Sequence, residues 1–234
     1  MGLIVASPVL VPATIAIWLQ DCHSPLYIAP RVGRDGRIFR MVKLRSMVVN
    51  ADKSGVDSTG AQDRRITAIG RFVRRGKLDE LTQLWNVLIG DMSLVGPRPN
   101  VKRETDLYTA VERKLLTVQP GITDLASIVF ADEGEILADK PDPDIAYNQL
   151  IRPWKSRLGL FYIERRSLLL DAGLCALTLV AIVKRPAALA GVAWTLKKLG
   201  ADADLVEIAY RRKDLQPCPP PGASEIVFSR LPAR

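Results

Sequence analysis

The chain has 234 residues and carries 33 Lys and Arg against 25 Asp and Glu, a formal net charge of +8 at pH 7. This length can bury a sizeable core, and an apolar fraction of 48% is typical of a globular protein. The excess positive charge favours anionic partners: nucleic acid, phospholipid head groups or phosphorylated substrates. One histidine (His23), three widely spaced cysteines and no Cys-x-x-Cys pair argue against a Ser-His-Asp triad, a zinc site and a disulfide framework.

An uncharged apolar run covers residues 3–19 and is at the short limit for crossing a bilayer, which takes about 20 residues. Pro8 and Pro12 interrupt the run, and each removes a backbone donor and favours a kink in a helix. We therefore expect residues 1–28 to form a bent segment that dips into one leaflet of a membrane and returns. A buried core helix is the alternative.

A β-hairpin is expected over residues 31–45, because Asp35-Gly36 is a type I′ turn signal between alternating basic and apolar residues. We expect one face to carry Arg and Lys side chains and the other to carry Val32, Ile38 and Met41. Such a hairpin would lie against anionic lipid head groups. The alternative is a solvated strand face.

A polar, glycine-containing loop is expected over residues 50–64. Helical spacing of apolar residues follows, first at Ile66, Ile69, Phe72 and Val73 and again at Leu78, Leu81, Leu84, Trp85 and Leu88.

Two adjacent carboxylates, Asp79 and Glu80, lie in the first turn of the second predicted helix. The spacing directs Asp79 away from the apolar stripe, to the side of Gln83 and Asn86, and places Glu80 nearer the other edge. Acids at the start of a helix are often only partners of the helix dipole. Acids among cations such as Arg74 can also stay ionised, hold a divalent cation and act beside an anionic substrate, a combination that suits phosphoryl transfer.

A second apolar run covers residues 167–183 and is followed by Lys184-Arg185-Pro186 and further apolar residues. We expect helices over residues 167–215 that lie in a membrane interface with basic flanks; a core helix and its neighbour are the alternative. From residue 216 the proline-rich sequence predicts an extended, disordered tail.

A series of short motifs runs in order along residues 24–175. The motifs are Ser24-Pro25, Arg31-Val-Gly33, Lys43-Leu-Arg-Ser-Met47, Arg65-Ile-Thr67, Gly70-Arg-Phe72, Leu78-Asp-Glu-Leu81, Asn86-Val-Leu88, Gly90-Asp-Met-Ser-Leu-Val-Gly-Pro-Arg-Pro99 and Pro120-Gly-Ile-Thr123. Together they resemble the bacterial monotopic phosphoglycosyl transferases, also called initiating sugar transferases, in their small single-domain form. Around the two acids, Lys77 and Thr82 stand where family members usually carry Ser and Pro.

The resemblance implies an enzyme that moves a phosphosugar from a nucleotide diphosphate sugar, usually UDP-linked, to a polyprenol phosphate such as undecaprenyl phosphate. The products would be a polyprenol diphosphate sugar and UMP, in the first membrane step of exopolysaccharide, O-antigen, capsule or glycoprotein glycan assembly. The resemblance also places the protein on the phospholipid membrane, at the cytoplasmic face of the bacterial inner membrane. Whether the chain forms a homodimer stays open.

The roles of the two acids also follow from the resemblance. The family's aspartate attacks the sugar-bearing phosphate, which implies that Asp79 is the nucleophile and forms a covalent phosphosugar intermediate. Glu80 would assist metal binding or accept a proton from the lipid phosphate. Carboxylates do act as nucleophiles at phosphorus. Mg²⁺ is the expected cofactor, held by Asp79 and Glu80, because this ion binds through one or two carboxylates plus substrate phosphates.

Cationic residues are predicted to bind the substrate phosphates. Arg98 lies between Pro97 and Pro99, which would shape the loop and hold the guanidinium as a rigid fork. Arg74 is a second candidate, with lipid head groups as its alternative partner. The complete predicted set is Arg98, Arg74, Arg71 and Lys43.

The predicted fold is α/β (α+β and mostly helical): a membrane-associated domain with an N-terminal re-entrant helix, a short β-hairpin and interfacial amphipathic helices. By resemblance to the family, the re-entrant helix breaks at Ser7 and Pro8. The predicted divisions are a re-entrant segment (1–28), a catalytic domain (29–166), C-terminal helices (167–215) and a Pro-rich tail (216–234). The alternative function is a non-catalytic basic module that binds a membrane surface or nucleic acid. An aromatic content of 6% and the lack of a recognised motif argue against nucleic acid.

Overall fold

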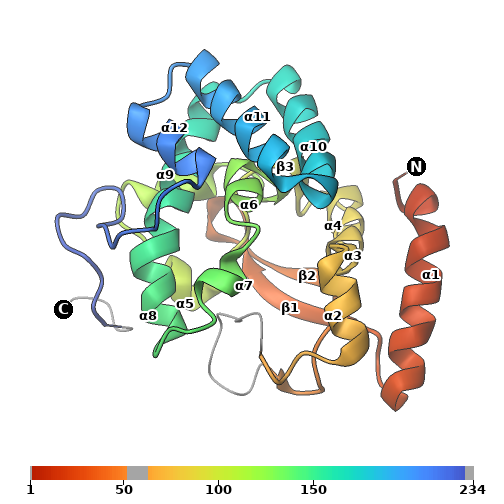
Figure 1. The fold of residues 1–234 in the computed structure, drawn as a ribbon. Helices are drawn as coiled ribbons and strands as arrows, with labels where there is room; N and C mark the ends of the chain where they lie inside the picture. The colour runs from red at the N-terminus through yellow and green to blue at the C-terminus, as the bar shows by residue number, and fades with distance from the viewer. Residues whose placement is uncertain (1, 52–62, 230–234) are drawn as a thin grey trace.

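The computed structural model describes residues 2–51 and 63–229, so most of the predicted loop at 50–64 lies outside the described residues. The first half of the chain contains α1 (Gly2–Asp21), β1 (Leu26–Val32), η1 (Arg34–Gly36), β2 (Ile38–Leu44), α2 (Ala68–Arg75), α3 (Leu78–Leu81), α4 (Leu84–Leu88), β3 (Ser93–Val95) and α5 (Lys102–Thr105). The second half contains η3 (Glu112–Thr117), β4 (Gly121–Thr123), α6 (Leu125–Val129), α7 (Glu133–Ile136), α8 (Pro143–Ala146), η4 (Tyr147–Ile151), α9 (Arg152–Arg165), α10 (Leu168–Val183), α11 (Arg185–Lys198) and α12 (Ala203–Tyr210). The predicted class is confirmed: α/β and mostly helical, with a short antiparallel hairpin (Figure 1).

α1 is one continuous helix that includes Pro8 and Pro12, and it runs along the outer side of α2, α3 and α4 (Figure 1). The predicted break at Ser7 and Pro8 is therefore wrong. Pro8 has no N–H to donate to the carbonyl of Ile4, four residues earlier. The Ser7 hydroxyl donates to that carbonyl at 2.7 Å, so the helix continues through the proline without leaving its acceptor unpaired.

α1 packs on the rest of the protein through an apolar contact and an ion pair. Ile17 packs with Leu44 of β2 and Val73 of α2 in a small separate core. At the end of the helix, the carboxylate of Asp21 accepts two hydrogen bonds of 2.6 Å from the guanidinium of Arg45. Within the described residues, no helix combines the length and the apolar character that crossing a membrane requires.

The hairpin forms around the predicted turn, but β1 begins at Leu26, before the predicted start at residue 31, and the strands pair antiparallel from Leu26↔Leu44 to Val32↔Ile38. Asp35 and Gly36 at its tip both have a positive φ, 57° and 74°. Two successive residues with positive φ are what a type I′ turn requires, and glycine meets that requirement without steric cost.

The predicted division of the hairpin into a cationic and an apolar face is wrong. Residues two apart on a strand share a face, so Phe39, Met41 and Lys43 lie together on β2, and Arg31 faces Phe39 across the strands. Phe39 and Met41 are buried, whereas Ile38 on the other face is 54% exposed. The inner face of the hairpin thus carries apolar and cationic side chains together.

α3 and α4 turn their polar side toward the interior. The buried side chains recur at helical spacing and are at most 9% exposed: Asp79, Thr82, Gln83 and Asn86. The apolar stripe faces outward, with Trp85 49% and Leu88 69% exposed. This orientation confirms the predicted side for Asp79 and leaves an apolar strip on the surface.

Two of the sequence motifs meet as a short parallel sheet, in which Ser93 of β3 pairs with Gly121 of β4. A Cβ on Gly121 would lie 2.1 Å from the backbone nitrogen of Gly96, so this close approach of two main chains requires glycine. The sheet fixes the start of the loop that carries Arg98.

The main core lies between α6, η4, α9, α10, α11 and α12. Its fully buried members include Val129, Ile151, Leu158, Leu174 and Leu196. Segments before and after residue 167 therefore contribute to one apolar core.

Residues 216–229 are extended but packed against the domain, so the prediction of a disordered tail is wrong for this part. The backbone N–H of Cys218 donates to the carbonyl of Gln149 at 3.1 Å, and Gln149 Nε2 donates to the carbonyl of Val227 at 2.8 Å. Arg157 Nη2 donates to the carbonyl of Pro219 at 3.0 Å. A proline has no backbone N–H to donate, but its carbonyl can still accept a hydrogen bond. The side chains that donate to carbonyls of the tail come from η4 (Gln149) and α9 (Arg157).

Candidate active site

The two acids follow a sharp turn between α2 and α3. α2 ends at Arg75 with Gly76 as its C-cap, and Lys77 adopts a left-handed backbone conformation (φ 55°, ψ 21°), which is uncommon for a residue other than glycine. The chain thus changes direction just before the first turn of α3, which carries Asp79 and Glu80. Asp79 is 7% exposed, so its carboxylate is largely removed from bulk water.

Glu80 is bound by Arg98 from the other side of the site. Arg98 Nη1 donates to Glu80 Oε2 at 3.1 Å, and Arg98 Nη2 donates to Glu80 Oε1, the two-point geometry that matches a guanidinium to a carboxylate. Arg98 also donates to the carbonyl of Ile122 in β4 at 3.4 Å. The pair therefore links α3 to the short parallel sheet.

This environment keeps Glu80 ionised. Burial is the largest influence on the pKa of Glu80 and raises it, but the charges of Arg98 and Lys43 and the hydrogen bonds from Arg98 together lower the pKa below its usual value.

Asp79 has the opposite environment. Among the described residues, no side chain donates a hydrogen bond to the Asp79 carboxylate, and burial raises its pKa. The charges of Lys43, Arg98 and Arg74 act against this rise, and the charge of Glu80 adds to it. The site therefore holds one carboxylate that is bound by Arg98 beside one that accepts no side-chain hydrogen bond from the described residues.

Lys43 enters the site from the inner face of β2. Burial, together with the charge of Arg98, lowers the pKa of its ammonium group from 10.5 to about 8, although the charges of Glu80 and Asp79 raise it. Loss of the proton from Lys43 would thus lower the net charge of the group formed by Lys43, Asp79, Glu80 and Arg98.

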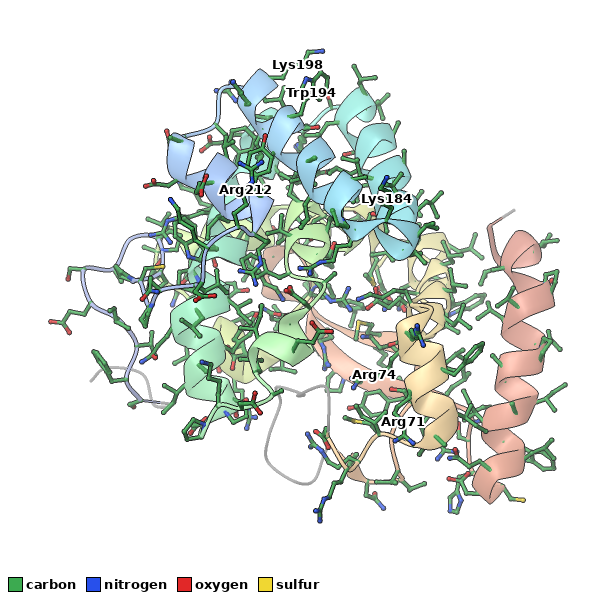
Figure 2. The ribbon with its side chains drawn as sticks, in the orientation of Figure 1. Arg71, Arg74, Lys184, Trp194, Lys198 and Arg212 are labelled. Atoms are coloured by element: carbon green, nitrogen blue, oxygen red, sulfur yellow. The ribbon has the colours of Figure 1, made fainter. Side chains whose placement is uncertain are left out.

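The structure brings together four of the predicted site residues: Asp79, Glu80, Arg98 and Lys43. Arg74, in the last turn of α2, acts on Asp79 through its charge (Figure 2). Arg71, one turn earlier, is exposed and donates to the carbonyl of Ile66 at 3.4 Å. The side chain of Arg71 is thus engaged with the start of its own helix.

The residues predicted to shape the loop, Pro97 and Pro99, are both buried and flank Arg98. The proposed helix break at Ser7 and Pro8 lies in α1, apart from the cluster.

Sequence reasoning missed two charged residues near the site. The charge of Arg31 acts on Lys43. The two share a face because the strands pair Arg31 with Phe39, whereas the predicted two-residue turn at Asp35-Gly36 would pair Arg31 with Arg40. Asp124 is 3% exposed, and its charge acts on Arg98. Its carboxylate accepts from the backbone N–H of Ser127 at 2.6 Å, and the Asp-x-x-Ser capping pattern was the signal that could have located it.

A cavity of about 50 Å³ adjoins Arg98 and is lined by Tyr108, Asp124, Tyr147 and Arg152 among others. A volume of this size holds only a few water molecules and cannot accept a nucleoside. Arg98 and Glu80 keep 29% and 15% of their side chains exposed, so a substrate phosphate would approach the pair from its open side.

The carboxylate oxygens of the two acids are suitable ligands for Mg²⁺. Asp79 offers an unpaired carboxylate, and the oxygens of Glu80 retain lone pairs beyond those that bind Arg98. Across the described ranges, no cluster of three or more His, Cys, Asp or Glu side chains could hold a metal ion by itself. The ion would therefore complete its coordination with substrate phosphate oxygens and water, as Mg²⁺ usually does.

Comparison with known proteins gives an independent view of the chain. The model of a family described as bacterial sugar transferase matches residues 1–185. The UDP-galactose-lipid carrier transferase of Erwinia amylovora is 42% identical over 121 residues, which cover 45% of this chain and 25% of the relative. The undecaprenyl-phosphate galactose phosphotransferase of Salmonella typhimurium is 41% identical over 143 residues, covering 53% of this chain and 29% of the relative.

A third relative is the UDP-glucose:undecaprenyl-phosphate glucose-1-phosphate transferase of Caulobacter vibrioides. It is 36% identical over 156 residues, which cover 64% of this chain and 58% of the relative. The chain thus spans between 25% and 58% of the lengths of these three relatives.

Proposed function

Because the chain belongs to the bacterial sugar transferase family, we propose that it transfers a phosphosugar from a UDP-sugar to undecaprenyl phosphate, giving undecaprenyl diphosphate sugar and UMP. One observation carries the proposal: of two adjacent carboxylates, Glu80 is bound by Arg98, while Asp79 is buried with no hydrogen-bond donor among the described residues. The names of the Salmonella and Caulobacter relatives support the class of acceptor.

The reaction runs in two steps at one phosphorus atom. In the first, a carboxylate oxygen of Asp79 attacks the sugar-bearing phosphorus of the donor. A P–O bond to Asp79 forms, the P–O bond to the bridging oxygen breaks, and UMP leaves with that electron pair. In the second, an oxygen of undecaprenyl phosphate attacks the same phosphorus and the bond to Asp79 breaks, which restores the carboxylate. Splitting a transfer through a covalent carboxylate intermediate is established chemistry.

We assign Glu80 to positioning and not to proton transfer. Its lowered pKa makes the carboxylate a weak base, and a phosphate monoester with a second pKa of about 6 is largely ionised at pH 7 without a base. Glu80 holds the guanidinium of Arg98 and would bind Mg²⁺ together with Asp79. When bound, the ion supplies charge stabilisation to the transferring phosphoryl group.

Lys43 and Arg98 would stabilise the negative charge on the phosphoryl oxygens. Lys43 projects from a hairpin strand, and Arg98 is anchored to the carbonyl of Ile122. Cationic donors that are held in place before the reaction need little reorganisation during it.

We further propose that the outer surface of α1, α4, β3 and α10 rests in the cytoplasmic leaflet of the bacterial inner membrane. Contacts connect α1 to α4, α4 to β3, and β3 to α10, so these elements are neighbours. Their exposed apolar side chains include Ile4, Trp18, Trp85, Leu88, Leu94, Leu179 and Val183. Exposed apolar area spread over neighbouring elements marks an interaction surface.

The orientation of α3 and α4 connects this surface to the reaction. The two helices present Trp85 and Leu88 outward and Asp79 inward, so about one helix diameter separates the apolar surface from the nucleophile. A lipid phosphate at head-group level could thus reach Asp79 while its polyprenol chain stays in the bilayer.

Charged and aromatic residues on α11 fit the same placement. Lys184 and Lys198 lie at the two ends of this helix (Figure 2). Trp194 lies beside Lys198, with 4.9 Å between the ammonium nitrogen and the ring centre. Basic residues and tryptophan are typical of the membrane–water interface.

Release of UMP tests the proposal. A panel of UDP-sugars is incubated with undecaprenyl phosphate and Mg²⁺, and the wild type is compared with Asp79→Asn. We expect Asp79→Asn to lose about a thousandfold or more of the activity. Asp106→Asn, which removes an exposed carboxylate of an ion pair with Lys102, should retain it. Full turnover by Asp79→Asn contradicts the nucleophile, and no UMP from the wild type with any donor contradicts the function.

A further inference from the structure

Gln83 is a buried side chain with an unused donor. It is 1% exposed, and its amide nitrogen Nε2 has no hydrogen-bond partner among the residues that the structure describes. Burying an amide without a partner destabilises a folded protein, so an unpaired amide in this place requires an explanation.

The other polar side chains on the same helix face are paired. Asn86 Nδ2 donates to the carbonyl of Arg40 at 2.8 Å, and the backbone N–H of Val42 donates to Asn86 Oδ1 at 3.0 Å. Thr82 Oγ1 donates to the carbonyl of Val42 at 3.0 Å. The backbone of β2 therefore satisfies the neighbours of Gln83 but not Gln83 itself.

Helix geometry gives the direction of Gln83. Thr82 and Gln83 both have right-handed helical backbone angles, so the turn continues from α3 into α4. At about 100° per residue, Gln83 lies about 40° from Asp79 toward Glu80, whereas Thr82 lies about 60° to the other side. Because Thr82 is the side chain that reaches β2, Gln83 is directed toward the side of Glu80 and Arg98.

A substrate phosphate would draw on several donors, among them Lys43 and the N–H groups of Arg98 that do not bind Glu80. The two terminal nitrogens of Arg98 bind Glu80. A phosphoryl group in transfer spreads negative charge over three equatorial oxygens, and preorganised donors at those oxygens stabilise the transition state. A neutral amide suits this task beside Asp79, because it donates without forming an ion pair with the nucleophile.

We propose that Gln83 Nε2 donates a hydrogen bond to a non-bridging oxygen of the sugar-bearing phosphate that Asp79 attacks. The inference rests on the proposed function and adds a substrate-binding residue to it. It also explains why the amide is unpaired in the protein alone: its partner is the phosphate.

Substitution by methionine, which has nearly the same shape and no donor, separates this role from a structural one. Gln83→Met should have a Tm in the absence of substrate equal to or above that of the wild type, because no bond within the protein is lost. Its kcat and kcat/KM for UMP release should fall together, by at least tenfold. Gln149→Met is the matched control, since Gln149 Nε2 is paired with Val227; it should lower the Tm and leave kcat unchanged.

The outcomes distinguish the inference from the function on which it rests. If the wild type releases UMP and Gln83→Met does so with the same kcat and KM, Gln83 does not bind the phosphate and the proposed function stands. A Tm of Gln83→Met below that of the wild type means that the amide is paired within the protein, and this also overturns the inference. Absence of UMP from the wild type overturns the function itself.

Discussion

The adjacent carboxylates of the site differ because of the single residues that surround them. Burial raises the pKa of Asp79, whereas the charges of Arg98 and Lys43 overcome burial and lower the pKa of Glu80. Environments that separate two pKa values in this way assign different roles to the two groups. The helical spacing correctly placed Asp79 on the side of Gln83. It could not show which acid is bound by Arg98, because that contact joins residues 18 positions apart through the fold.

The pH dependence of the reaction should report on Lys43. Its pKa of about 8 means that the ammonium group is charged below pH 8 and neutral above it. Since the charge supports an anionic donor, kcat/KM for the UDP-sugar should decline as the pH rises through about 8. Lys43→Arg keeps its charge to much higher pH, so in this variant the decline should disappear.

Lys102→Arg is the control for this measurement, because Lys102 is an exposed lysine paired with Asp106. It should show the alkaline decline of the wild type. A decline that persists unchanged in Lys43→Arg would mean that another group titrates.

At the scale of elements, apolar periodicity located α2, α3 and α4 but could not say which side is buried. The polar side faces inward because Thr82 and Asn86 find their partners on the backbone of β2. Proline, the residue that the resemblance led us to expect at position 82, has no hydroxyl to make the contact with Val42. The left-handed turn at Lys77 has no signal in the sequence, since lysine does not favour that conformation.

The predicted break in α1 is absent, although Pro8 and Pro12 both lie inside the helix. At Pro8 the Ser7 hydroxyl replaces the missing donor to the carbonyl of Ile4. The hairpin shows the opposite case. Its turn was predictable from Asp35-Gly36, because few residues tolerate positive φ.

Ser7→Ala should therefore loosen the start of α1. The variant leaves the carbonyl of Ile4 without a donor, so the amides of the first two turns should exchange hydrogen faster, by about fivefold to tenfold for a lost bond of about 1 kcal/mol. Thr14→Ala is the matched control. The Thr14 hydroxyl donates to the carbonyl of Leu10 at 2.7 Å, but that carbonyl already has the helical N–H of Thr14 as a partner.

Hydrogen exchange followed by mass spectrometry measures both variants. Equal exchange in Ser7→Ala and the wild type would show that the hydroxyl does not hold the helix through Pro8.

At the scale of the whole molecule, the site lies directly beneath an apolar surface. Composition could indicate an anionic partner through the charge of +8, but only the fold shows that α1, α4, β3 and α10 present their exposed apolar residues on neighbouring elements. The tail is a further property of the complete fold, because the donors that hold it come from η4 and α9.

Membrane binding tests this arrangement. Leu88 is 69% exposed on α4, and Leu88→Asp should weaken binding to phosphatidylglycerol-containing vesicles by at least tenfold, since burying a leucine contributes about 1.5–3 kcal/mol. Phe228→Asp is the matched control: Phe228 is 75% exposed and belongs to the C-terminal tail, and this tail lies across the molecule from α1 (Figure 1). Cosedimentation that is equally weakened in both variants would contradict the proposed membrane face.

The covalent intermediate is the central claim, and intact-protein mass spectrometry tests it most directly. The protein is incubated with its UDP-sugar and Mg²⁺ but without undecaprenyl phosphate, so that the second step cannot proceed. We predict a mass increase of one phosphosugar, located on the peptide that contains Asp79 and absent from Asp79→Asn. UMP release by the wild type with no adduct, or with the adduct on another residue, would contradict the assignment of Asp79 as the nucleophile.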